Sequence, residues 1–321
     1  MDVILVYLLL FGLFLLLAGY FLPFAGNRTG VILAWLFAIV TVFYSVMVTN
    51  DKSPLYRMIA IVSLQLLSMK TVVAAQTYSH RNGLTFIQWC AFSLGWFGMR
   101  PVLFEKLPST PLSSLALIIK GVSRILLGLL LIYLSALAET FSIKIYFLPE
   151  LLLLVGLSLI LHFGILNLST ATWRLSGVDV RELFRSPYLS KSLKEFWGKR
   201  WNVAFSEMTA LIVFRPLKTR ISPGMAMIVS FLVSGLLHEI AISFPVKSGY
   251  GLPLLYFAIH ATLMFLEERL AVIKKIIQHP ILSHVWVLGW LILPMPLLFH
   301  ADFIEFVLIP IRQAILGLLN V

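Results

Sequence analysis

Runs of about twenty mostly apolar residues recur along nearly the whole chain, with only short polar turns between them. A helix of that length crosses a hydrocarbon layer about 30 Å thick, whereas a helix on the surface of a soluble protein needs only an apolar stripe. Of the 321 residues, 60% are hydrophobic and 12% are charged, and the mean hydropathy is +0.96. The pattern therefore predicts an all-α, polytopic integral membrane protein.

The apolar runs predict about eight to ten transmembrane helices in one membrane-embedded domain that covers residues 1–321. They lie at residues 3–22, 30–49, 55–75, 84–99, 114–138, 146–168, 224–243, 251–268, 282–299 and 303–320. The N-terminal Met-Asp lacks the basic region and cleavage site of a signal peptide, so we expect the first run to be a retained span.

Positive charge is concentrated in one part of the chain. Lys and Arg number 25 against 14 acidic residues, which gives a net charge of +11, and ten of the 25 lie between Arg174 and Arg220. This concentration favours an anionic ligand or anionic membrane lipid as a partner. Nucleic acid is not expected as a partner, because no motif of a nucleic-acid-binding module is present.

The loops predict the orientation in the membrane, because short loops rich in Lys and Arg stay on the cytosolic side. If the basic segment 174–220 is cytosolic, the same side carries Lys52, Arg57, Arg100 and Lys106, and the other side carries Arg28, Arg81 and Lys144. We therefore expect both termini and the face that binds an anionic ligand to be cytosolic, in a bacterial cytoplasmic membrane or the endoplasmic reticulum.

One apolar run, Val203–Phe214, is too short to cross the bilayer and has basic residues at both ends. We expect a re-entrant or interfacial segment there, just before the helix that carries His238. The chain has one cysteine, Cys90, in apolar surroundings, so neither a disulfide nor a cysteine-rich metal site is predicted.

The segment 192–202 reads Ser-Leu-Lys-Glu-Phe-Trp-Gly-Lys-Arg-Trp-Asn. Ser192 and Glu195 have the spacing of a capping box, which predicts a helix from Leu193. Helical spacing then places the apolar side chains on one face, namely Leu193, Phe196, Trp197 and Trp201. One interpretation is an amphipathic helix that lies on the membrane with its tryptophans at the interface.

The other interpretation is a ligand site, in which the apolar face of this segment covers an acyl chain. The cations predicted to contact phosphate groups are then Lys199, Arg200 and Arg185. Asn202 fits neither face. If the helix continues, Asn202 points to the polar side; if the helix ends there, its amide can reach into a pocket.

His238 lies inside the apolar run 224–243. A helix that begins at Gly224 carries it about 21 Å into the bilayer, where ionisable groups are rare and usually functional. Ser234 lies one turn earlier and could fix the ring by a hydrogen bond. Burial favours the neutral imidazole, which is the form that a general base requires. The alternative is a structural histidine bonded to a neighbouring carbonyl, an interpretation that suits His162 and His260 better.

Together, the segments 192–202 and 231–239 (Phe-Leu-Val-Ser-Gly-Leu-Leu-His-Glu) resemble the wax synthase branch of the membrane-bound O-acyltransferases. The detailed resemblance covers residues 174–243. It implies transfer of a fatty acyl group from acyl-CoA to the hydroxyl of a long-chain, lipophilic alcohol. It also implies that His238 is the general base and that Asn202 orients the alcohol or the thioester. Acyl-CoA would be a co-substrate, with no tightly bound cofactor and no metal.

Other functions remain open. Within the same branch, the acceptor could be a sterol or the donor a short acyl group. In another class, a transporter or proton relay could use His238, His260 and Glu239, although the chain shows no internal repeat of the kind such proteins often have. A haem protein could use His162, His238 or His260 as axial ligands.

Overall fold

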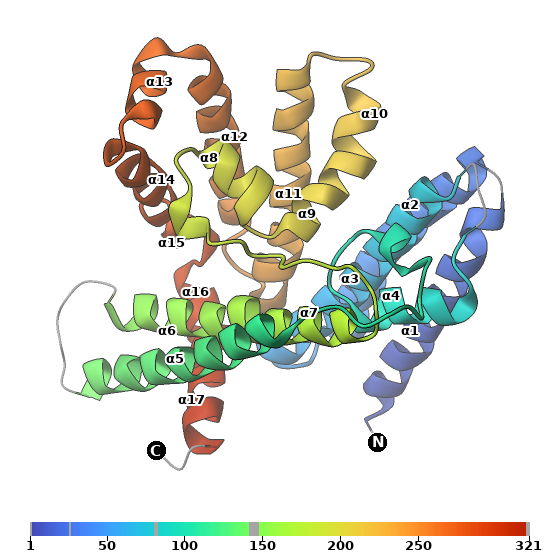
Figure 1. Ribbon diagram of the computed structural model, residues 1–321. Helices are drawn as coiled ribbons and strands as arrows, with labels where there is room; N and C mark the ends of the chain where they lie inside the picture. Colours follow the sequence, from blue (N-terminus) through green and yellow to red (C-terminus); the bar gives the residue numbers. More distant parts are fainter. Residues whose placement is uncertain (1, 26, 80–82, 141–147, 319–321) are drawn as a thin grey trace. The chain divides into compact units, whose positions relative to one another are not determined.

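The computed structural model describes residues 2–25, 27–79, 83–140 and 148–318, and every regular element in these ranges is a helix (Figure 1). This confirms the predicted all-α architecture. The chain divides into two compact units. The first consists of Met1–Glu105 and Ser186–His300, and the second of Lys106–Arg185 and Ala301–Val321.

The first unit contains most of the helices. Its elements are α1 (Val3–Phe21), η1 (Leu22–Ala25), α2 (Asn27–Val48), α3 (Pro54–Thr77), α4 (Phe86–Gly95), η2 (Pro101–Phe104), η4 (Pro187–Leu189), α8 (Leu193–Glu195), η5 (Phe196–Arg200), α9 (Val203–Thr209), η6 (Ala210–Phe214), α10 (Arg215–Leu217), α11 (Pro223–Val246), α12 (Leu252–Arg269), α13 (Ala271–Gln278), α14 (Leu282–Ile292) and α15 (Met295–Leu298). The second unit contains α5 (Leu115–Thr140), α6 (Leu148–Ser158), η3 (Leu159–Ile165), α7 (Leu166–Leu175), α16 (Ala301–Phe303), η7 (Ile304–Leu308) and α17 (Ile309–Leu318).

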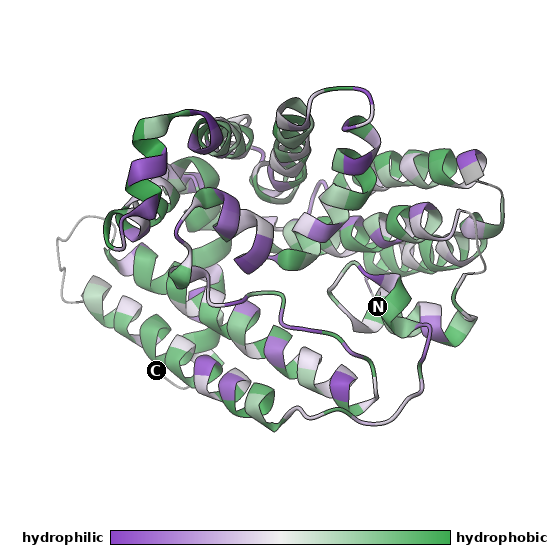
Figure 2. Cartoon of the chain, turned by 45° about the horizontal axis from the view of Figure 1, so that its top comes forward, coloured by the Kyte–Doolittle hydropathy of each residue, from purple (hydrophilic) through white to green (hydrophobic). Residues whose placement is uncertain are grey.

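Within the described ranges, six helical stretches are long and apolar enough to cross a membrane. They are Val3–Ala25, Arg28–Val48, Pro54–Thr77, Leu115–Ala138, Leu148–Leu175 and Pro223–Val246. A pair bent by 110°, α13 with Leu282–Leu298, would give a seventh. Figure 2 shows hydrophobic residues along most of these helices. The protein is therefore a multi-pass membrane protein.

Six or seven spans are fewer than the eight to ten predicted, and three runs explain the difference. Run 84–99 forms only the ten-residue α4, because the chain becomes extended at Trp96. Run 251–268 forms α12, which ends in three consecutive charged residues. Run 303–320 forms α16, η7 and α17, a stretch that carries three charged residues, Asp302, Glu305 and Arg312. Two loop residues used to predict the orientation, Arg81 and Lys144, lie outside the described residues.

Helix α3 lies at the centre of the first unit and packs against α1, α2 and α11. Its Lys70 is fully buried, and the ammonium group donates to the carbonyls of Phe92 (2.7 Å), Trp96 (2.5 Å) and Gly98 (3.1 Å). These carbonyls belong to the C-terminal end of α4 and the residues after it, where helical partners are missing. The buried cation therefore caps α4 from a neighbouring helix.

Helices α11 and α12 pack side by side in opposite directions. At one end, the Glu239 carboxylate of α11 accepts the N–H groups of Gly251 (2.8 Å) and Leu254 (3.3 Å) at the start of α12. At the other end, a Cβ on Gly224 at the start of α11 would lie only 3.0 Å from the Phe265 ring of α12. The start of α11 therefore lies beside the end of α12.

In the second unit, α5 packs against α6, η3 and α7 through glycines. A Cβ on Gly128 of α5 would lie 2.7 Å from the Gly156 carbonyl oxygen of α6, and one on Gly121 would lie 3.1 Å from the Gly164 carbonyl oxygen of η3. Small residues at such positions let membrane helices approach backbone to backbone.

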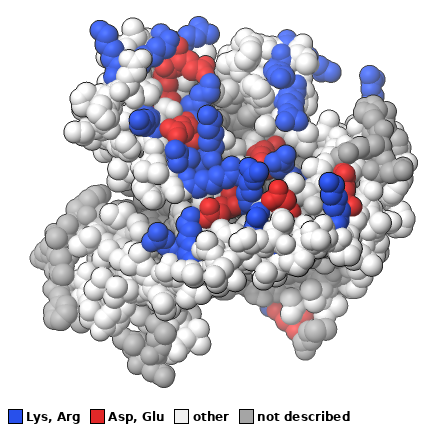
Figure 3. Space-filling model, viewed as in Figure 1, with Lys and Arg blue, Asp and Glu red and all other residues white. Residues whose placement is uncertain are grey.

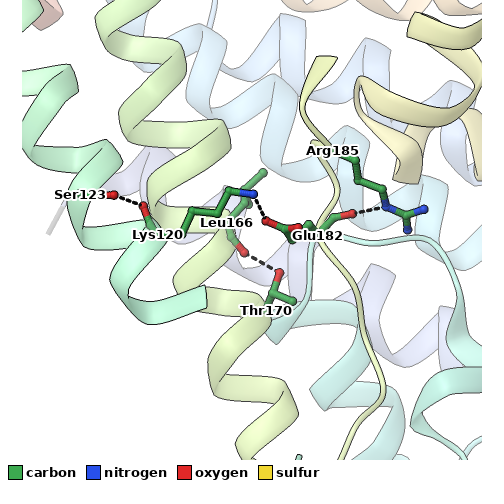
Figure 4. A network of polar contacts seen from close by, with 6 residues as sticks. All are labelled: Lys120, Ser123, Leu166, Thr170, Glu182 and Arg185. Carbon is green, nitrogen blue, oxygen red and sulfur yellow. Dashed lines mark hydrogen bonds and ion pairs between the residues drawn. The ribbon is translucent and has the colours of Figure 1, made fainter. Parts of the chain in front are cut away.

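The segment after α7 is held to α5 by ion pairing (Figure 4). The Lys120 ammonium of α5 lies 2.6 Å from the Glu182 carboxylate, and the Arg185 Nε donates to the Glu182 carbonyl at 2.9 Å. Arg185, one of the predicted phosphate contacts, thus belongs to the second unit, where its guanidinium is tied to the local backbone.

Candidate active site

A cavity of about 300 Å³ lies in the first unit and joins the Trp-rich segment, α9 with η6, α11 and α12. Seven α11 residues line it at helical spacing: Pro223, Gly224, Met227, Ser230, Phe231, Ser234 and His238. The cavity therefore follows one face of α11 for about 21 Å between Gly224 and His238. Most of its wall is apolar or aromatic, as is usual for sites that bind lipophilic ligands.

His238 lines the cavity, and its ring orientation is fixed. Its Nδ1 lies 2.8 Å from the Ser234 carbonyl oxygen, so Nδ1 carries the hydrogen and donates it. In the neutral imidazole the lone pair is then on Nε2. The ring packs against Phe257 (4.3 Å between centroids) and Phe205 (5.3 Å). The predicted link to Ser234 exists, but it uses the backbone carbonyl rather than the hydroxyl.

Asn202 also lines the cavity, and the helix before it has ended. Trp201 is extended, and Asn202 has φ 42° and ψ 61°, a left-handed conformation that Asn tolerates better than most residues. Its Oδ1 accepts the Phe205 N–H at 3.3 Å and so caps α9. Of the two positions considered for Asn202, the structure has the one in which its side chain reaches a pocket.

The Trp-rich segment begins as predicted and then departs from a regular α-helix. The Ser192 hydroxyl accepts the Glu195 N–H at 3.0 Å, whereas the Glu195 carboxylate accepts from Lys191 rather than completing the box. The next turn, η5, is π-helical and closes with the Trp201 N–H bonded to the Phe196 carbonyl at 2.8 Å. Such turns occur often at functional sites.

The aromatic residues of this segment divide into two groups. Trp197 and Trp201 line the cavity. Phe196 does not line it; it is buried in a core cluster with Leu193 and Met264 and stacks on Trp201 (5.4 Å between centroids). Two of the three predicted aromatic contacts are therefore at the cavity, and the third supports them from behind.

The cations predicted to contact phosphate are not those at the cavity. Arg200 pairs with Glu195 at 2.7 Å, Lys199 does not line the cavity, and Arg185 belongs to the second unit. Burial raises the pKa of the Glu195 carboxyl, but the Lys191 N–H and the Arg200 guanidinium outweigh this effect and hold the pKa below its usual value. Lys194 is the only Lys or Arg of the described chain that lines the cavity, and it forms an ion pair with Glu268.

A buried carboxylate that no sequence pattern singled out, Glu267, lies at the end of α12. It accepts the N–H groups of Leu193 (2.8 Å) and Lys194 (3.1 Å) and the indole N–H of Trp286 (2.9 Å). Glu267 thereby fixes the start of the Trp-rich segment against α12 and α14. The sequence feature that could have indicated Glu267 is a pair of acids, Glu267 and Glu268, directly after an apolar run.

The other ionisable residues singled out from the sequence have structural partners. Glu239 caps α12, as described above. His260 is fully buried, donates from Nδ1 to the Tyr256 carbonyl (2.9 Å) and contacts the Trp197 ring. His162, in the second unit, bonds to Ser158 at 3.0 Å and stacks on Phe184. No group of three or more His, Cys, Asp or Glu that could hold a metal occurs among the described residues.

Basic side chains gather around one end of the first unit. Figure 3 shows Lys and Arg over the ends of α10, α12 and α13. The residues concerned are Arg215, Lys218 and Arg220 after η6 and Arg269, Lys274 and Lys275 at α12 and α13. This is also the end at which α11 begins, so anionic groups are favoured there.

Comparison with known proteins identifies the same part of the chain. Residues 180–259 match the membrane bound O-acyl transferase family. The matched range contains the Trp-rich segment, Asn202, α9 to α11 and His238.

Similar proteins come from plants. The chain is 39% identical over 72 residues to a long-chain-alcohol O-fatty-acyltransferase of Simmondsia chinensis, and the matched region covers 20% of each protein. It is 30% identical over 139 residues to probable long-chain-alcohol O-fatty-acyltransferase 6 of Arabidopsis thaliana, covering 38% of the chain and 40% of that relative. It is 32% identical over 104 residues to acyl-CoA–sterol O-acyltransferase 1 of the same plant, covering 29% and 30%. The chain thus matches less than half the length of each of these relatives.

Proposed function

Residues 180–259 of this chain match the membrane bound O-acyl transferase family, and we propose that the chain belongs to the wax synthase branch of that family and transfers a fatty acyl group from acyl-CoA to the hydroxyl of a long-chain alcohol. The products would be a wax ester and free coenzyme A. The main support is the imidazole of His238, which borders the cavity with Nδ1–H bonded to a carbonyl.

In the proposed reaction, the lone pair on Nε2 of His238 accepts the proton of the alcohol O–H. The alcohol oxygen forms a bond to the thioester carbonyl carbon, and the carbonyl electrons move to its oxygen. When the carbonyl re-forms, the C–S bond breaks and the thiolate of coenzyme A takes the proton from the imidazolium. Atoms and charges balance, and the imidazole returns to its neutral form.

Asn202 would orient a reacting oxygen. Its Oδ1 is occupied by the cap of α9, whereas its Nδ2 donates to no residue of the described chain. A free amide N–H beside the cavity can donate to the alcohol oxygen or to the thioester oxygen as negative charge develops. The aromatic wall, with Trp197, Trp201 and Phe231, would cover the acyl chain.

The coenzyme would bind from the cytosol, where the basic residues around the start of α11 favour a polyanion. The membrane would be a bacterial cytoplasmic membrane or the endoplasmic reticulum. A sterol is the second candidate acceptor, because one relative of similar identity is named an acyl-CoA–sterol O-acyltransferase.

The test is coenzyme A release by the detergent-purified protein from a long-chain acyl-CoA, with a long-chain alcohol, with a sterol and with no acceptor. We expect acceptor-dependent release and formation of the ester, and a loss of about a thousandfold in kcat for His238→Ala. The matched control is His284→Ala, since His284 also donates from Nδ1 to the carbonyl four residues earlier (2.8 Å) but does not line the cavity.

Three outcomes would contradict the proposal. Acceptor-independent hydrolysis would make the protein a thioesterase, and full activity of His238→Ala would exclude His238 as the base. Absence of release with every acceptor, together with absence of acyl-CoA binding, would remove the acyltransferase proposal altogether.

A further inference from the structure

We propose that Lys194 is the residue that contacts the phosphate groups of the acyl donor at the cavity rim, and that Glu268 competes with the donor for it. This inference rests on the proposed function. Three of the cations considered from the sequence, Lys199, Arg200 and Arg185, do not line the cavity, whereas Lys194 does.

Lys194 and His238 lie toward opposite ends of the cavity. Glu268, the partner of Lys194, follows Phe265 by less than one helical turn, and the Phe265 ring lies against Gly224 at the start of α11. The His238 ring instead contacts Phe257, nearer the start of α12. Since α11 and α12 run in opposite directions, the ion pair is level with Gly224, about 21 Å along α11 from His238.

This separation suits the shape of an acyl-CoA. Thirteen covalent bonds join its thioester sulfur to the nearest phosphorus, or about 15 Å when extended, at the length per bond of an extended peptide chain. The Lys194 side chain spans the remaining few ångströms. A donor with its thioester at His238 therefore brings its phosphates within reach of Lys194.

The ion pair between Lys194 and Glu268 is suited to exchange. The two side chains are 61% and 41% exposed, and a pair this accessible contributes little stability. The two linked phosphates of the coenzyme together carry two negative charges, against one on the carboxylate, and offer more acceptor oxygens, so they are the stronger partner for an ammonium group. Once Lys194 has turned to the donor, the Glu268 carboxylate is left facing an anion and repels it.

The backbone of Lys194 does not have to move in this exchange. Its N–H is bonded to the buried carboxylate of Glu267 at 3.1 Å, and the N–H of Leu193 before it is bonded to the same carboxylate at 2.8 Å. The two adjacent acids thus act on different parts of one residue. Glu267 fixes the main chain of Lys194, and Glu268 holds its side chain at the rim.

The test is calorimetric binding of coenzyme A to the purified protein, which separates donor binding from catalysis. We expect Lys194→Gln to weaken binding about tenfold and Glu268→Gln to tighten it severalfold. The effect of Lys194→Gln should shrink as the salt concentration rises, because the pair is exposed. The control is Lys191→Gln, a nearby exposed cation that does not line the cavity, and thermal unfolding of each variant reports its folding.

The opposite effects expected of Lys194→Gln and Glu268→Gln on coenzyme A binding distinguish a contact with the donor from a purely structural ion pair. If the ion pair only braced the fold, both Lys194→Gln and Glu268→Gln would lower the unfolding temperature and weaken binding together, and the inference would be overturned. Wild-type affinity in Lys194→Gln would overturn it as well. If the wild type binds no coenzyme A and releases none from acyl-CoA, it is the proposed function that fails.

Discussion

At the scale of single residues, the polar groups of α11 illustrate how an apolar helix can carry chemistry. The hydroxyls of Ser230 and Ser234 and the Nδ1–H of His238 each donate to the carbonyl four residues earlier, at 2.8, 3.0 and 2.8 Å. Donors in a membrane helix need such partners, because lipid offers none. The hydroxyl oxygens of Ser230 and Ser234 and the Nε2 of His238 therefore remain as acceptors along the cavity wall.

Asn202 caps α9 and, in the proposed reaction, donates to a reacting oxygen, and substitutions can separate these two roles. Asn202→Asp keeps an oxygen to cap α9 and tolerates the left-handed backbone, but it removes the Nδ2 donor. We expect the free energy of unfolding to stay within about 0.5 kcal/mol of the wild type, because Asp and Asn cap helices equally well. We expect kcat to fall about a hundredfold, because a donor to the reacting oxygen is lost.

Steady-state kinetics and thermal unfolding of the same preparation check this prediction. Asn202→Gly is the companion variant, since it keeps the backbone conformation and removes both the cap and the donor. Full turnover of Asn202→Asp would assign Asn202 to capping alone.

The sequence located some of these residues and missed others for a physical reason. His238 and Asn202 stand out because ionisable and amide groups contrast with their apolar surroundings. Glu267 and Glu268 could not be assigned, because their partners Leu193 and Lys194 lie 74 residues earlier in the chain. Such pairs depend on how α12 folds back, which no local pattern records.

At the scale of elements, the main departure from the sequence analysis is the break between Phe196 and Asn202. Periodicity predicted one helix through Trp201, and the structure has three α-helical residues, a π-helical turn and a left-handed residue. The apolar pattern cannot distinguish these, because a π-helical turn changes the hydrogen-bond partner by one residue only. The run Val203–Phe214 is helical and is not among the spans, which agrees with its short length.

Glu267 joins three elements, so its removal should act on the fold as well as on the site. We expect Glu267→Ala to lower the free energy of unfolding by about 3 kcal/mol, because three donors lose their acceptor. Glu267→Gln should lower the free energy of unfolding by roughly half as much, since the amide oxygen of Gln can still accept. Denaturation in detergent, followed by circular dichroism, measures both. Asp51→Asn, at an exposed loop position, is the control; a Glu267→Ala protein as stable as that control would contradict the prediction.

At the scale of the whole molecule, composition was a sound guide to class and a poor guide to the number of spans. An apolar run does not reveal whether the helix bends, as α13 and α14 do, or ends early, as α4 does. Those outcomes depend on tertiary contacts such as the cap that Lys70 provides to α4. The division into two units was not visible in the sequence either, since the second unit draws on two separate stretches of chain.

The predicted orientation can be tested on the intact chain. In a Cys90→Ala background, Thr219→Cys between α10 and α11 should react with an impermeant maleimide only from the cytosolic side, and Arg28→Cys at the start of α2 only from the opposite side. Both positions are exposed. Labelling of right-side-out and inside-out vesicles gives the result, and the reverse pattern would move the basic face away from the cytosol.

The antiparallel packing of α11 and α12 has a consequence for selectivity. The packing of α12 against α11 keeps the pair of Lys194 and Glu268 level with Gly224, so the interval along α11 from this pair to His238 is fixed. In the proposed function, a donor bound through its phosphates at Lys194 would place its thioester at one depth, whatever the length of its acyl tail. A preference for chain length would then depend on the residues that contact the tail beyond His238.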